Sequence, residues 1–191
     1  TNRRDCFENQ GGVRRKLTAN YIQEMRVAAE VIAANDKFLL VAHQNPDGDA
    51  LGSALGMAHL LRENGKSAIV TWPQPFVDAW KTYSILPGID DCVAPESIAE
   101  QPNVVITFDC ASKERIGEVS GFIDRADTLV VIDHHYSNES FGDVNVIDKD
   151  AAATAMVVRE LAQVLEWPLN KEAAYCLYVG LVTDTGRFAF S

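Results

Sequence analysis

Short apolar runs alternate with segments of helical periodicity along most of this chain. The apolar runs predict strands at 38–42, 67–72, 104–108, 128–132 and 144–147, and the periodic segments predict helices at 21–34, 50–63, 151–165 and 170–182. Parallel strands need long connections, which are usually helices. The alternation therefore predicts an α/β fold, with a doubly wound, mainly parallel sheet and helices on both faces.

Two local features refine this expectation. Asn20 and Gln23 have the spacing of a capping box, so we expect them to begin the first helix. The stretch 72–87 contains tryptophan and proline and has little periodicity, which predicts an excursion over the surface.

Length and composition exclude several classes of protein. At 191 residues with 47% hydrophobic content, the chain is expected to form one domain around one core. Apolar stretches such as 38–42 are far shorter than the about 20 residues that a membrane span requires. No signal peptide is visible, so we predict a cytoplasmic protein without a membrane partner. The four cysteines form no Cys-x-x-Cys pair, which favours reduced thiols.

The charge limits the nucleic acids that could bind. A formal net charge of −10 disfavours duplex DNA, because nonspecific binding depends on many basic residues that neutralise phosphates. Any nucleic-acid partner should be short. A solubilising role for the acidic residues stays open until they are placed in the fold.

Carboxylates and imidazoles follow three of the predicted strands. They are His43, Asp47 and Asp49 after 38–42, Asp109 after 104–108, and Asp133, His134 and His135 after 128–132. The first loop alone could be an ordinary turn with a helix cap. Because parallel strands deliver their ends to one edge, however, all three groups should meet there.

Acidic groups beside buried strands need a compensating charge, and a divalent cation supplies it. Mixed imidazole and carboxylate ligands suit Mn2+, Fe2+, Co2+ or Zn2+, and the absence of thiolates favours the harder ions. We expect Mn2+ first, with Mg2+ or Co2+ as alternatives.

Four segments carry a resemblance to a known family. In order, they are His43-x-x-x-Asp47-x-Asp49, Asp109, Asp133-His134-His135 and Asp184-Thr185-Gly186, and they resemble the four motifs of the Asp-His-His (DHH) phosphoesterases. Arg115-Ile116-Gly117, and the Asn138, Phe141, Gly142 and Asn145 pattern after the third motif, are most similar to the nano-RNase branch. Ala153-Thr154 resembles a small-residue-Thr pair of that branch, with alanine in place of the commoner serine.

The resemblance implies a role for each matching residue. His43 and Asp47 would bind one metal ion, Asp49, His134 and Asp184 would bind a second, and Asp109 would bridge both. Asp133 would orient an imidazole. His135 and Arg115, with Arg187 as a weaker third, would contact the substrate phosphate, and a hydroxide bridging the metals would attack phosphorus in line. His59 and Cys110 are expected to be structural.

The resemblance also implies a substrate class and a domain plan. We expect a two-metal phosphoesterase acting on short oligoribonucleotides or 3′,5′-bisphosphonucleotides. Inorganic pyrophosphatase, cyclic-dinucleotide phosphodiesterase and a non-catalytic nucleotide-binding module are the alternatives, and a homodimer stays open. Residues 1–17 should form a polar arm and 18–191 the catalytic domain. The Gly-rich His motif of the family's second domain is not found in these 191 residues, so both a fragment and a natural single-domain protein remain open.

Overall fold

The structure is a computed structural model that describes residues 18–189. The arm predicted for residues 1–17 lies outside the described residues. Within the described part, no helix is both long enough and apolar enough to cross a membrane.

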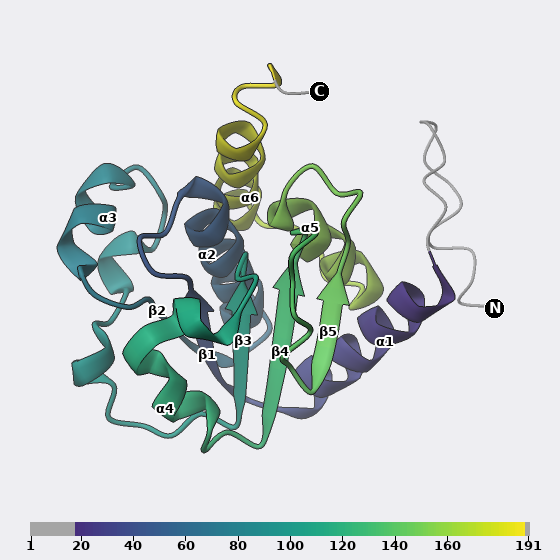
Figure 1. Ribbon diagram of the computed structural model, residues 1–191, viewed down its shortest axis with the longest axis horizontal. Coiled ribbons are helices and arrows are strands. Elements are labelled where there is room, and N and C mark those ends of the chain that lie inside the picture. The colour runs from purple at the N-terminus through teal and green to yellow at the C-terminus, as the bar shows by residue number, and fades with distance from the viewer. Residues whose placement is uncertain (1–17, 190–191) are drawn as a thin grey trace.

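A five-stranded parallel sheet forms the centre of the fold (Figure 1). The strands stand in the order β2-β1-β3-β4-β5, which confirms the predicted α/β class. Their bounds are β1 Lys37–Ala42, β2 Ser67–Thr71, β3 Val104–Phe108, β4 Thr128–Asp133 and β5 Val144–Ile147.

The register of the sheet aligns the ends of its three central strands. Ala42 pairs with Phe108, and Phe108 pairs with Ile132. The residues that follow these three positions therefore emerge side by side at one edge. Those residues are His43, Asp109 and Asp133.

Helices cover both faces of the sheet. One face carries the four long helices, α1 Ala19–Ala34, α2 Gly48–Glu63, α5 Thr154–Val164 and α6 Lys171–Asp184. The other face carries η4 Lys113–Val119 and α4 Ser120–Ile123. The shorter elements α3 Phe76–Thr82, η2 Ile89–Asp91 and η3 Pro95–Ser97 connect β2 to β3.

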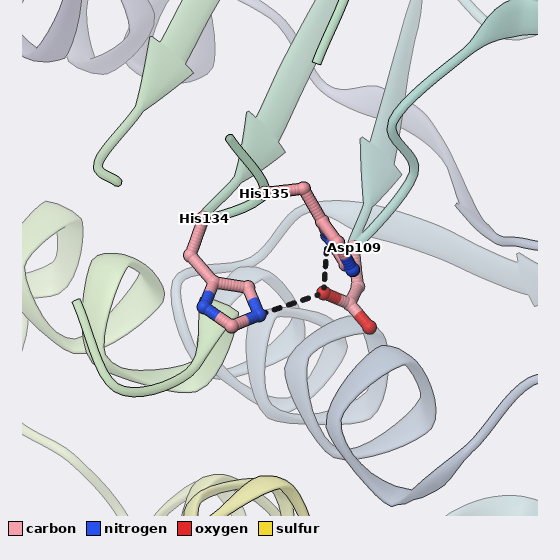
Figure 2. A group of neighbouring side chains, drawn as sticks. All are labelled: Asp109, His134 and His135. Carbon is pink, nitrogen blue, oxygen red and sulfur yellow. Dashed lines mark ion pairs between the residues drawn. The ribbon is translucent and has the colours of Figure 1, made fainter. Parts of the chain in front are cut away.

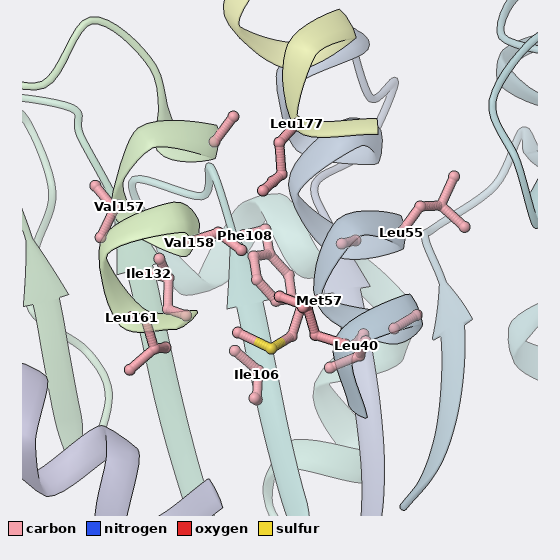
Figure 3. Close-up of a cluster of buried hydrophobic side chains, with 14 of the residues drawn as sticks. Leu40, Leu55, Met57, Ile106, Phe108, Ile132, Val157, Val158, Leu161 and Leu177 are labelled. Atoms are coloured by element: carbon pink, nitrogen blue, oxygen red, sulfur yellow. The ribbon is translucent and has the colours of Figure 1, made fainter. Parts of the chain in front are cut away.

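The larger core lies between the sheet and the long helices (Figure 3). Leu40, Ile106 and Ile132 point from the strands toward side chains such as Met57 of α2 and Leu161 of α5. All five are fully buried. This alternate-residue burial leaves the other side of each strand to pack against η4 and α4.

One local expectation was wrong. The N-cap of α1 is Thr18, whose Oγ1 accepts from the Tyr21 N–H at 3.2 Å, so Asn20 lies inside the helix and makes no capping box with Gln23. The stretch 72–87 is largely exposed, in keeping with the expected excursion over the surface, and it holds α3, a seven-residue helix too short to show periodicity.

Close packing of α2 against α6 brings Asp184, the last predicted metal ligand along the chain, toward the other ligands. A Cβ added at Gly52 would lie 2.5 Å from the Cys176 carbonyl oxygen, so only glycine permits this approach. A Cβ at Gly180 would lie 2.8 Å from Asp49 Oδ1. The helices therefore set the beginning of α2 beside the end of α6, which carries Asp184.

Candidate metal centre

The loop after β1 turns into α2 through the side chain of Asp47. Its Oδ1 accepts hydrogen bonds from the N–H groups of Asp49 and Ala50, both at 3.0 Å. The backbone of Asn45 just before it has φ +53°, and Asp109 after β3 has φ +57°. Left-handed residues other than glycine cost energy and concentrate at functional sites.

The structure brings together all six predicted metal ligands. Three groups have their ligand atoms within 4.8 Å of one another, namely His43 with Asp47 and Asp109, Asp49 with His134 and Asp184, and Asp109 with His134 and His135. The first two groups match the two predicted ligand sets. Which residue binds which ion stays a prediction.

Asp109 groups with His43 and Asp47 and also with His134 and His135, and Figure 2 shows its side chain facing the two adjacent histidines. His43 Nε2 is 3.7 Å from its Oδ2, and His134 Nε2 is 3.5 Å from its Oδ1. The two oxygens of one carboxylate thus face different imidazoles. This is the arrangement that a bridging carboxylate requires.

His134 is oriented by a backbone carbonyl. Its Nδ1 lies 3.1 Å from the Ala151 oxygen, which leaves Nε2 facing the carboxylates, 3.6 Å from Asp184 Oδ2. A metal-binding histidine usually donates its other ring N–H in this way.

The carboxylates at the centre crowd one another. Burial raises the pKa of Asp49 well above its usual value, and the charges of Asp109 and Asp184 raise it further. Burial also raises the pKa of Asp184, and Asp109 adds to the shift. Bound cations would relieve this repulsion, so the donor set fits divalent metal ions.

Asp133 orients His135 rather than the predicted ligand His134. Asp133 Oδ1 is 2.7 Å from His135 Nδ1, and Asn138 Nδ2 donates to Oδ2. Burial alone would raise the pKa of Asp133, but these hydrogen bonds hold it below its ordinary value. The same Asp133 contact raises the pKa of His135 to about 9. Because Nδ1 is engaged, only Nε2 of His135 is free for another partner.

The two predicted arginines are placed differently. Arg115 Nη2 lies 3.1 Å from His43 Nδ1, so this exposed side chain borders the centre. Gln44 O, at 2.8 Å, competes for the same nitrogen. Arg187 is exposed beyond α6, and within residues 18–189 no hydrogen bond or ion pair joins its guanidinium to the site.

The two residues expected to be structural lie outside the ligand groups. His59 Nε2 is 3.0 Å from the Pro87 oxygen. The Cys110 thiol donates to the Ser112 oxygen at 3.1 Å, and burial raises its pKa to about 12. A thiol in this state is a poor nucleophile at neutral pH.

Thr154 is a site residue to which sequence reasoning assigned no role. Its buried hydroxyl donates to Asp109 Oδ1 at 2.9 Å, and its backbone N–H donates to Asp49 Oδ2 at 2.6 Å. The N–H of Ala155 adds a bond to Asp49 Oδ1 at 3.0 Å. The beginning of α5 thus fixes carboxylates of both predicted ligand sets. The Ala153-Thr154 pair is the sequence feature that could have pointed to this role.

Comparison with known proteins identifies a family. The family model described as "DHH family, N-terminal domain" matches residues 37–181. The bifunctional oligoribonuclease and PAP phosphatase NrnA of Thermus thermophilus is 33% identical over 174 residues, covering 90% of this chain and 50% of that protein. Its Bacillus subtilis counterpart is 32% identical, covering 83% and 49%. The chain therefore spans about half the length of these relatives.

Three further proteins are similar to this chain in sequence or in fold. The cyclic-di-AMP phosphodiesterase GdpP of Geobacillus thermodenitrificans is 30% identical, covering 83% of this chain and 26% of that protein. An exopolyphosphatase-related protein from Bacteroides fragilis superposes with a TM-score of 0.79 at 26% identity, covering 92% of this chain and 54% of that chain. RecJ from Thermus thermophilus, solved with Mn2+, shares the fold, with a TM-score of 0.55 at 17% identity over 85% of this chain and 24% of that one.

Proposed function

Because the chain belongs to the DHH family, we propose that it is a phosphoesterase that hydrolyses short oligoribonucleotides or 3′,5′-bisphosphonucleotides with two divalent metal ions. The position of Asp109 carries the proposal, since its two oxygens face His43 and His134 separately. The names of the Thermus and Bacillus relatives support the substrate class. As part of the same proposal, residues 18–191 form the catalytic domain.

The residues present favour Mn2+ over softer ions. His43 and Asp47 would hold one ion and Asp49, His134 and Asp184 the other, with Asp109 shared between them. No thiolate belongs to the ligand groups, and carboxylates outnumber imidazoles. Such a pair of ions supplies activation of a water molecule and neutralisation of charge on the phosphoryl oxygens.

The remaining polar side chains orient the substrate. His135 is held through Nδ1 by Asp133, so its Nε2 is directed away from that contact and can donate to a phosphate oxygen. Arg115 borders the same centre, and a guanidinium binds phosphate oxygens in a bidentate manner. Thr154 keeps Asp109 oriented while substrate binds.

A substrate panel tests the proposal. Mn2+-loaded protein would be assayed with a dinucleotide, 3′-phosphoadenosine-5′-phosphate, cyclic di-AMP and pyrophosphate. We expect release of product from the first two. Turnover of pyrophosphate alone would indicate an inorganic pyrophosphatase, and turnover of cyclic di-AMP alone would indicate the activity named for GdpP. Absence of all turnover would favour a binding module.

A further inference from the structure

A pocket of about 590 Å³ is lined in part by Tyr136 and Asn138 of the loop that follows β4. It is lined by the beginning of α1 and by the segments that follow β4 and β5. Figure 1 shows β5 at the edge of the sheet, with α1 beside it. None of the six predicted metal ligands lines this pocket, so it is separate from the ligand groups.

The pocket and the metal centre share two backbone segments. Tyr136 lines the pocket and directly follows His135. Lys149 also lines the pocket, two residues before Ala151, whose carbonyl oxygen contacts His134. Asn138, also in the lining, donates to Asp133 Oδ2, so a direct side-chain contact joins the pocket to the residue that orients His135.

The ring of Tyr136 is available for stacking. Its residue is 74% exposed, and Lys149 Nζ lies 6.0 Å from the centre of the ring. Tyr21, the other tyrosine of the lining, is buried and donates its hydroxyl to Glu160 at 2.7 Å. Exposed aromatic rings bind single-stranded nucleic acids by stacking on their bases.

The charges of the lining select which part of a nucleotide can enter. Among the lining residues that the structure describes, Glu24, Asp148 and Asp150 contribute carboxylates and Lys149 is the one cation. Carboxylates repel a phosphate, and they are acceptors of the kind that the amino groups of a base require. Lys149, close to Tyr136, can attract the phosphate that lies outside.

We propose that this pocket is a nucleoside subsite, in which the base of a nucleotide joined to the scissile phosphate stacks on Tyr136 while Lys149 contacts the phosphate. The inference rests on the proposed function and deepens it. It predicts that a dinucleotide is preferred over pyrophosphate, a phosphoanhydride that has no base.

Substitutions of Tyr136 test the subsite through the kinetics of a dinucleotide. Loss of one stacked base should lower kcat/KM of Tyr136→Ala by about 5- to 150-fold, mainly through a higher KM. Tyr136→Phe keeps the ring and should stay close to wild type. Tyr178→Ala is the matched control, because Tyr178 is 58% exposed on α6 and lies outside the pocket.

Binding can be followed without catalysis. Adenosine 5′-monophosphate added to the protein should shift the NMR amide signals of Tyr136, Asn145 and Lys149, and Tyr136→Ala should weaken the response. Unchanged kcat/KM for Tyr136→Ala, in a protein that cleaves the dinucleotide, would overturn the subsite and leave the function intact. If no phosphate ester is cleaved, the proposed function fails, and unmoved signals at these amides would overturn the subsite separately.

Discussion

Replacing Thr154 by valine removes one hydroxyl from the centre of the site and keeps nearly the same side-chain volume. That hydroxyl donates to Asp109 Oδ1 at 2.9 Å, and both residues are buried. A hydrogen bond to a charged group contributes about 1.5–3 kcal/mol. At about 1.4 kcal/mol per factor of ten, the affinity for Mn2+ should fall roughly 10- to 150-fold. Substitutions that disturb the orientation of metal ligands generally cost about 10- to 100-fold, which agrees.

Calorimetric titration of metal-free protein with Mn2+ measures this loss directly. Thr154→Ser keeps the hydroxyl and should restore most of the affinity. Thr107→Val is the matched control, because Thr107 is buried in β3 and its hydroxyl has no hydrogen-bond partner among the described residues. Wild-type affinity in Thr154→Val, or an equal loss in Thr154→Ser, would refute the orienting role of the hydroxyl.

Other predictions concern the histidines, the helix contact and pH. His134→Ala should lose one of two bound Mn2+ ions, whereas His135→Ala should keep both ions and lose about 100- to 10,000-fold in kcat. Metal counting with kinetics checks both variants, and loss of an ion from His135→Ala with both ions kept by His134→Ala would contradict the assignment. Gly52→Ala should lower the free energy of unfolding by about 1–3 kcal/mol, because its Cβ would meet a carbonyl oxygen at 2.5 Å. Gly121→Ala is the control, since the nearest atom to its Cβ lies at 3.7 Å and its stability should not change. Equal urea midpoints for the two variants would contradict this. The raised pKa of Asp49 means that the folded metal-free protein holds this proton more tightly than the unfolded chain. Its thermal midpoint should therefore fall as pH rises above the usual range of an aspartate, and Mn2+ should reverse the fall. A rising midpoint without metal would be inconsistent.

Much of the sheet and one half of the site could be predicted from the sequence. Apolar runs at 104–108 and 128–132 correspond to β3 and β4, and a parallel sheet delivers the following Asp109 and His134 to one edge. Local order along the chain is enough for this inference.

The other half depends on packing that periodicity does not reveal. Asp184 ends α6 and reaches the centre only because Gly52 and Gly180 let two helices approach closely. Thr154 acts through hydrogen bonds to residues 45 and 105 positions away. Likewise, the direction of the His135 ring is set by its contact with Asp133, and strand and helix periodicity cannot choose between the adjacent histidines, which only the family resemblance told apart.

Counting the metal ions bound by Asp109→Asn tests the central claim most directly. Asp109 lies between both ligand sets, and an amide has no charge to balance two cations. In parallel Mn2+ titrations, wild-type protein should bind two equivalents, and Asp109→Asn should lose affinity at both positions together with dinucleotide hydrolysis. Two full equivalents bound by Asp109→Asn with wild-type affinity would contradict a centre in which one carboxylate joins two metal ions.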